Sequence, residues 1–192
     1  FFGDFVRGTG TPLSFDFSGV NFDTDVAAAT TTMIGSESVA SLVDAGGTDF
    51  TGAKNRGAKI ILTTGWEDPV VPPRHVIEYY ESVVAGAAFG GDLTTARNTF
   101  RLFMIPGGGH LAGPGAPGAS GIGNPFGNPS TAQDAQHDVI SALEAWVEQG
   151  VAPDVMIGAK YVNDSPAAGV QRTRPLCLYP GLPRYTGSGD MN

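Results

Sequence analysis

Hydrophobic residues form two short, nearly continuous runs in the middle of the chain, and each run is followed by a loop and a helical pattern. The first run, "AKIILTTG" (58–65), is rich in β-branched residues, as is typical of a strand buried on both faces of a parallel sheet. After the loop "GWEDPVVPP" (65–73), the segment 74–87 has apolar residues at helical spacing: Val76, Tyr79, Tyr80, Val83 and Val84. The sequence therefore predicts a strand, a loop and a helix in succession.

The same order recurs once further along the chain. "TFRLFMIPG" (99–107) is a second candidate for a buried strand, and a long glycine-rich loop follows it. The segment 131–154 then predicts an amphipathic helix closed by Gly150 and Pro153, with one apolar face made of Val139, Ile140, Leu143, Trp146 and Val147. Two such units favour an α/β fold with a parallel sheet. Because two strands alone do not make a stable sheet, we expect other segments to complete it.

The flanking regions have weaker patterns. Residues 1–30 show no steady period and predict irregular structure, whereas 25–43 is expected to be helical in part. "FTGAKNRGAK" (50–59) predicts a short helix that stops at Gly57. Residues 151–192 are proline-rich and are expected to form a loop-rich tail. The strand-loop-helix units thus occupy 58–150 of a single 192-residue domain.

Composition narrows the classes of partner. The formal net charge is −8 and no Lys/Arg cluster exists, which argues against nucleic-acid binding. No run of about 18 apolar residues is present, so no membrane span is predicted. The N-terminal "FFGDFVRGTG" lacks the layout of a signal peptide, and its two phenylalanines suggest a chain that begins inside a fold.

Asp68 and His110 are the candidate catalytic residues. Each follows a predicted parallel strand, so both side chains should lie at the same edge of the sheet, where ligands of open α/β folds bind. The glycines before His110 would let the backbone pass close to a neighbouring loop. A carboxylate that fixes the tautomer of a histidine and stabilises its charged form is what a triad hydrolase requires. The order Asp then His is also that of the α/β-hydrolases.

Each residue also has an ordinary structural interpretation, and the nucleophile is missing. Asp68 in an Asp-Pro step could be a turn former, and His110 a surface residue of a glycine-rich loop. No G-x-S-x-G elbow exists, and "GASGIG" (118–123) departs from it. His75 and His137 fall in predicted helices without a suitable second ligand, so no metal site is expected. "DAGGTD" (44–49) lacks the ligand spacing of a calcium loop.

Several stretches over residues 20–192 resemble the C-terminal part of the tannase and feruloyl esterase family. They are "GAKIILTTGWEDPVVPPRHVIEYYESVV", "RLFMIPGGGH", "ALEAWVEQGVAPD" and "RTRPLCLYPGLPRYTGSGD", of which the last is the most specific. The resemblance implies the C-terminal portion of an α/β-hydrolase fold, completed by another chain or segment. Residues 1–30 would then lead out of a lid domain that lies before this chain.

The resemblance also implies an activity. Asp68 and His110 match the catalytic aspartate and histidine of a serine-type carboxylic ester hydrolase that acts on small aromatic-acid esters, such as those of gallate or hydroxycinnamate. The family's serine, in a "C-S-x-G-G" elbow, would come from an N-terminal chain or segment of the same precursor. The family's structural calcium belongs to the lid, so no cofactor or metal is expected in this chain. A secreted protein is expected.

Two positions bear on how far the family pattern carries over. Leu111 stands where most members have a cysteine that is bonded to the one beside the serine, so this tether is absent. Cys177 is the single cysteine and is either a buried thiol or bonded to a partner outside these residues; it matches the family's tail cysteine. The alternatives are a non-catalytic or degenerate subunit of such a hydrolase, and a fragment of a prolyl-oligopeptidase-like peptidase, against which the tail motif argues.

Overall fold

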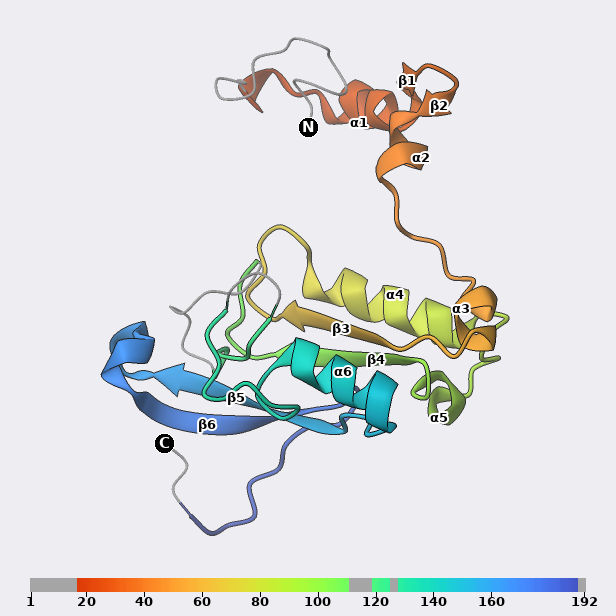
Figure 1. Ribbon diagram of the computed structural model, residues 1–192. Helices are drawn as coiled ribbons and strands as arrows, with labels where there is room; N and C mark the ends of the chain where they lie inside the picture. The colour runs from red at the N-terminus through yellow and green to blue at the C-terminus, as the bar shows by residue number, and fades with distance from the viewer. Residues whose placement is uncertain (1–16, 111–118, 125–127, 190–192) are drawn as a thin grey trace. The chain divides into compact units, whose positions relative to one another are not determined.

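The computed structural model describes residues 17–110, 119–124 and 128–189, and the chain divides into two compact units, 1–47 and 48–192 (Figure 1). Within the described ranges, no helix is long and apolar enough to cross a membrane.

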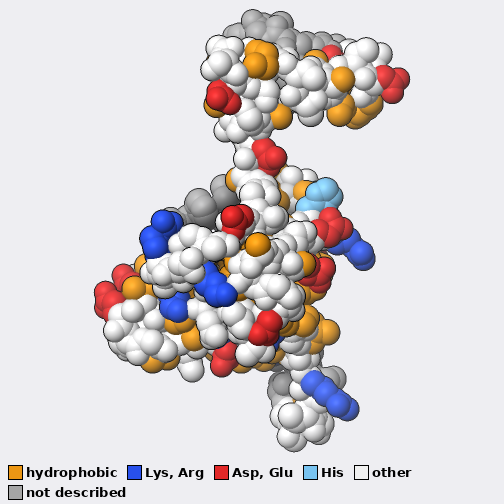
Figure 2. Space-filling view, turned by 90° about the vertical axis from the view of Figure 1, so that its right-hand side faces the viewer, with side chains coloured by type: hydrophobic (Ala, Val, Ile, Leu, Met, Phe, Trp, Pro, Cys, Tyr) orange, Lys and Arg blue, Asp and Glu red, His pale blue; other side chains and the backbone are white. Residues whose placement is uncertain are grey.

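The first unit consists of short elements with little buried surface. Its described elements are η2 (Phe17–Gly19), α1 (Phe22–Thr31), the antiparallel pair β1 (Met33–Ile34) and β2 (Glu37–Ser38), and α2 (Val39–Val43). The prediction of irregular structure for 1–30 is wrong from Phe22 onward, whereas α1 and α2 confirm the partial helix predicted for 25–43. The Asn21 side chain accepts hydrogen bonds from the Asp23 and Thr24 amides and so starts this helix within a weak apolar pattern. Several large apolar side chains of this unit are exposed (Figure 2).

The second unit contains the remaining elements. In chain order they are α3 (Thr51–Asn55), β3 (Ile60–Gly65), α4 (Pro73–Ala85), α5 (Leu93–Ala96), β4 (Phe100–Ile105), α6 (Val139–Gln149), β5 (Val155–Tyr161), η3 (Val162–Asp164), η4 (Pro166–Ala168) and β6 (Val170–Cys177). Both predicted buried strands are therefore present as β3 and β4, and the helices predicted after them as α4 and α6. On the face shown in Figure 2, acidic and basic side chains are interspersed, without a continuous basic area.

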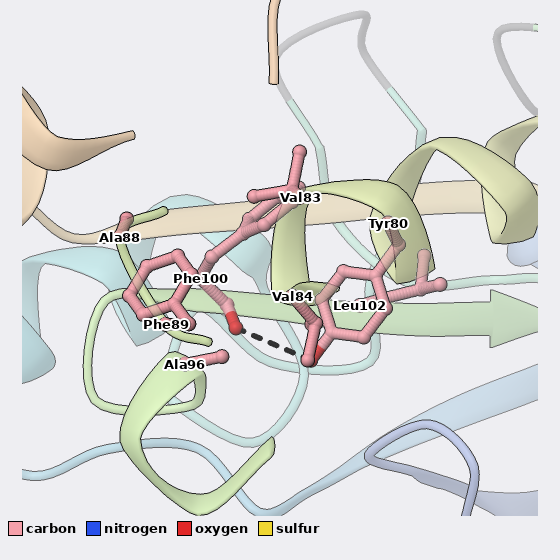
Figure 3. Close-up of a cluster of buried hydrophobic side chains, with 8 residues drawn as sticks. All are labelled: Tyr80, Val83, Val84, Ala88, Phe89, Ala96, Phe100 and Leu102. Atoms are coloured by element: carbon pink, nitrogen blue, oxygen red, sulfur yellow. Dashed lines mark hydrogen bonds between the residues drawn. The ribbon is translucent and has the colours of Figure 1, made fainter. Parts of the chain in front are cut away.

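Strands β3 and β4 are parallel neighbours, paired from Ile60 with Phe100 to Gly65 with Ile105. Alternate side chains face two different helices. One face packs against α4 in a cluster that contains Tyr80, Val83, Val84, Phe100 and Leu102 (Figure 3). The other face packs against α6 in a second cluster, which contains Phe103, Ile105, Val139 and Ala142. Burial on both faces is why these strands are apolar at successive positions.

Helix α6 ends at Gly150 as predicted, but it begins at Val139, eight residues after the start of the predicted segment 131–154, and its buried face matches the predicted one only at Val139 and Trp146. Asp138 caps its N-terminus by accepting from the Ser141 amide at 2.8 Å, and Gly150 ends it with a φ of 72°. The buried residues are Val139, Ala142, Ala145 and Trp146, whereas the predicted Ile140 and Val147 are 39% and 61% exposed. Ala142 lies in the second cluster with Phe103 and Ile105.

The prediction of a loop-rich tail for 151–192 is wrong for 155–177, which contains two strands. Strands β5 and β6 pair antiparallel from Val155 with Cys177 to Tyr161 with Val170. This hairpin joins the parallel pair just after β6, where Phe103 bridges Leu178 and the Tyr179 amide donates to the Leu102 carbonyl at 2.9 Å. The hairpin therefore belongs to the same packed unit as β3 and β4. From Gly181 to Gly189 the tail is loop, as predicted.

Candidate active site

The carboxyl ends of β3 and β4 bring Asp68 and His110 together. β3 ends at Gly65 and β4 at Ile105, and each residue lies in the loop that follows its strand. Nδ1 of His110 lies 3.1 Å from Oδ2 of Asp68. The two residues are 42 positions apart in sequence, so the contact depends on the parallel pairing of the strands.

Asp68 is held by its own loop. Its Oδ1 accepts hydrogen bonds from the amides of Val70 and Val71, at 2.8 and 2.9 Å, which leaves Oδ2 for His110. Pro69 has no N–H and sets the turn that aims the next two amides at the carboxylate. The Asp-Pro step therefore forms a turn, as its structural interpretation predicted, and the same turn orients the carboxylate of Asp68.

These contacts decide the charge of Asp68, whose side chain is only 8% exposed. Burial, the largest single influence, raises the pKa of this carboxyl, but the hydrogen bonds from the Val71 and Val70 amides and from His110 together outweigh it. The net pKa of Asp68 lies below its ordinary value. The residue is therefore a carboxylate near neutral pH, and it fixes the adjacent imidazole with Nδ1 as the donor.

A cavity of about 220 Å³ lies against Asp68 and His110. Its walls come from β3, from the first turn of α4 and from Asn124. The lining residues include apolar ones, such as Leu62 and Val76, and the polar residues Thr63 and Thr64. Such a mixture suits a small ligand with an apolar body and a polar group. His110, whose side chain is 38% exposed, borders this cavity.

The remaining sequence candidates lie elsewhere. His75 is in α4, as predicted, but His137 precedes α6 rather than lying within a helix, and it pairs with Asp134 at 2.7 Å. In the part of the chain that the structure describes, no three His, Cys, Asp or Glu side chains are grouped as metal ligands. Cys177 is a half-buried free thiol there. Leu111 lies outside the described residues.

Sequence reasoning missed the main-chain groups of the site, namely the Val70 and Val71 amides and the glycine at the end of β3. The Asp-Pro step was a signal for the former. The signal for Gly65 was a glycine directly after a run of β-branched and apolar residues, which often marks a close backbone contact.

The comparisons with known proteins agree with the motifs. The family model described as "Tannase and feruloyl esterase" matches residues 1–192. The chain belongs to this family. The resemblance drawn from the sequence motifs is therefore confirmed.

Three relatives illustrate how this family member compares. A protein of Xanthomonas campestris named an uncharacterized esterase is 49% identical over 99% of the chain. A mono(2-hydroxyethyl) terephthalate hydrolase of Piscinibacter sakaiensis is 37% identical over 76% of the chain. The crystal structure of feruloyl esterase B from Aspergillus oryzae matches 99% of the chain with a TM-score of 0.78 and 26% identity. That likeness confirms an α/β fold of the α/β-hydrolase kind.

The chain spans about a third or less of these relatives. It covers 34% of the Xanthomonas protein, 20% of the terephthalate hydrolase and 34% of the feruloyl esterase. The family is thus established for a segment that matches only part of each relative.

Proposed function

We propose that this chain is the C-terminal part of the catalytic domain of a serine-type carboxylic ester hydrolase, to which it contributes the aspartate and histidine of the triad. The observation that carries the proposal is the 3.1 Å contact between Oδ2 of Asp68 and Nδ1 of His110, where two parallel strands end beside a cavity. An acid and a histidine so placed have the geometry that nucleophilic acyl transfer requires.

The two residues would divide the work as follows. Asp68 accepts the Nδ1–H of His110, so Nε2 is the nitrogen that exchanges protons. Nε2 takes the proton of a serine hydroxyl as the serine oxygen bonds to the ester carbonyl carbon. It then gives that proton to the departing alcohol, which leaves an acyl-enzyme. A water molecule repeats the sequence and releases the acid, while Asp68 remains ionised and stabilises the imidazolium at each proton transfer.

The serine would come from another segment of the protein that contains this chain. The 192 residues hold no G-x-S-x-G or C-S-x-G-G elbow, and the relatives extend well beyond the matched region. We expect the partner to be an N-terminal chain or segment of the same precursor. The Asp-His pair needs no cofactor for this role, and the calcium expected in a family lid would lie outside this chain.

Esters of aromatic acids are the proposed substrates. The names of two relatives specify feruloyl and terephthalate esters, and the acid part of each contains an aromatic ring. The lining of the cavity, by apolar and polar residues together, fits a small molecule with an apolar body and a polar ester group. We also propose that the protein is secreted, in keeping with the expectation from the family.

A degenerate, non-catalytic subunit is the second candidate. The presence of Leu111 where most members have cysteine favours it, because the histidine then lacks a covalent tether to the serine region. A peptidase of the prolyl-oligopeptidase kind is not supported by the match of the tannase and feruloyl esterase model to the whole chain.

The test is made on the complete protein that carries this chain. A serine-directed fluorophosphonate should label it, and His110→Ala should lower both the labelling rate and the turnover of methyl ferulate or methyl gallate by at least about 10⁴-fold. His137→Ala is the matched control, because His137 also uses Nδ1 to bind an aspartate, Asp134, but does not line the cavity. Equal turnover in wild type and His110→Ala would refute the catalytic proposal, and absence of labelling would favour the degenerate subunit.

A further inference from the structure

The chain after β4 crosses directly over the end of β3 on its way to His110. The Trp66 amide donates to the Ile105 carbonyl at 3.0 Å, and the Glu67 amide donates to the Gly108 carbonyl at 2.9 Å. The loop that carries Asp68 is therefore bonded to the loop that carries His110 before either catalytic side chain is reached.

The crossing leaves no room for a side chain on the strand beneath. A Cβ atom added to Gly65 would lie 1.9 Å from the Gly108 carbonyl oxygen and 2.3 Å from its carbonyl carbon. A Cβ on Gly108 would lie 3.0 Å from the Cα of Gly65 and 3.2 Å from Cγ2 of Ile105. Neither Gly65 nor Gly108 has a positive φ, so the demand for glycine comes from contact and not from backbone conformation.

We infer that the contact of Gly65 with Gly108 is the positioning element that sets the distance from His110 to Asp68. This inference rests on the proposed function. Gly65 lies three residues before Asp68 and Gly108 two residues before His110, so the crossing, together with the hydrogen bond from the Glu67 amide to the Gly108 carbonyl, fixes the two loops to each other close to both side chains. A carbonyl pushed away from Gly65 carries His110 with it, because the intervening chain is too short to absorb the shift.

The displacement of the Gly108 carbonyl is large enough to break the hydrogen bond between His110 and Asp68. To reach ordinary van der Waals distance from a new Cβ, the Gly108 oxygen must move by about 1.5 Å. The bond between Nδ1 and Oδ2 is already 3.1 Å long, and a stretch of even half that size takes it beyond hydrogen-bonding range. Misplacement of a catalytic group by about 1 Å costs about 100-fold in rate.

Three alanine variants test the inference in a graded series on the complete protein. In Gly65→Ala, kcat for a methyl ester of ferulate or gallate should fall about 100-fold with little change in KM. Gly108→Ala, with its longer contacts of 3.0 and 3.2 Å, should fall less. Gly109→Ala, whose Cβ would meet no atom within 4 Å and whose φ is not positive, should fall least.

A second measurement reads the position of His110 without ester turnover. The carboxyl ¹³C resonance of Asp68 should titrate at a higher pKa in Gly65→Ala than in wild type, because the hydrogen bond from His110 is one of the contacts that lower it. The same resonance in Gly109→Ala should titrate as in wild type. This titration remains decisive if the protein hydrolyses no ester, so failure of the proposed function and failure of the positioning claim are distinguishable.

The inference is overturned if Gly65→Ala keeps both the wild-type kcat and the wild-type Asp68 titration, or if Gly109→Ala is impaired as much as Gly65→Ala. Should Gly65→Ala not fold, Gly108→Ala and Gly109→Ala are compared alone, and equal Asp68 titrations in these two variants would refute it.

Discussion

Substitution of Phe100 can measure how much the packing of aromatic rings adds to the stability of this fold beyond the burial of apolar area. It is 2% exposed at the start of β4 and contacts three other rings. The ring centroids of Phe50 and Tyr80 each lie 5.0 Å away, and that of Tyr79 lies 6.5 Å away in an edge-on arrangement. Tyr80 and Phe100 lie side by side in the close-up of this cluster (Figure 3). Phe103 is equally buried further along the same strand, but none of the ring contacts found within the described ranges involves it.

Leucine substitution at each position separates the two effects. Both Phe100→Leu and Phe103→Leu lose a similar apolar area, at a cost of about 1 kcal/mol. Phe100→Leu additionally loses the two ring pairs at 5.0 Å, which contribute about 1 kcal/mol each beyond their burial. We therefore expect Phe100→Leu to be less stable than Phe103→Leu by about 2 kcal/mol.

Urea unfolding followed by tryptophan fluorescence measures this difference, since Trp146 is buried against the same sheet. With a slope of about 2 kcal/mol per molar urea, the midpoint of Phe100→Leu should lie about 1 M below that of Phe103→Leu. Equal midpoints at equal slopes would show that the rings act only through their buried area, and the argument from geometry would fail.

Three further predictions concern charged side chains. The pKa of Asp68 is lowered in the folded state, so its carboxylate stabilises the protein at pH values above its ordinary pKa of 3.8. This stabilisation is lost as the pH falls through the lowered value. In Asp68→Asn, the melting temperature should therefore fall less steeply with decreasing pH than in the wild type. Asp138→Ala should cost about 1 kcal/mol in urea unfolding because the Ser141 amide loses its cap, whereas Asp138→Asn should cost little. Arg101→Met should lower the free energy of unfolding by about 2 kcal/mol, because the buried Arg101 side chain donates hydrogen bonds to three oxygens. It should also shift the fluorescence of Trp146, because the guanidinium lies over the indole ring, 5.0 Å from its centroid.

The parallel strands could be predicted from sequence because their burial leaves a direct trace. A strand covered by α4 on one face and α6 on the other is apolar at most successive positions, and both "AKIILTTG" and "TFRLFMIPG" are, apart from the threonines of the first and the buried Arg101 of the second. The face of α6 could not be predicted from hydrophobicity, because Ala142 and Ala145 are buried while the larger Val147 is exposed. Which side chains of α6 are buried depends on how the helix packs against the sheet, and the sequence of the helix alone does not give that packing.

The hairpin of β5 and β6 could not be predicted from sequence, because some of its residues are chosen by contacts with segments that are distant in the chain. Gly158 interrupts β5, yet a Cβ there would lie 2.1 Å from the Ala119 carbonyl oxygen, so the glycine admits another segment. Pro175 interrupts β6 opposite Ile157. A glycine and a proline normally argue against a strand, and the glycine is explained only by a contact with a segment distant in sequence.

Asp68 and His110 also differ in how far their positions could be predicted from the local sequence. The carboxylate of Asp68 is oriented by amides two and three residues further along, so a short stretch of sequence encodes its position. The position of His110 instead depends on the passage of Gly108 over Gly65, between segments that only the sheet brings together. Sequence could therefore place both residues at one edge, but not at hydrogen-bonding distance. It follows that substitutions in the loop of His110, and on the strand end beneath it, should disturb the Asp-His pair more than substitutions in the loop of Asp68 that keep its Asp-Pro turn.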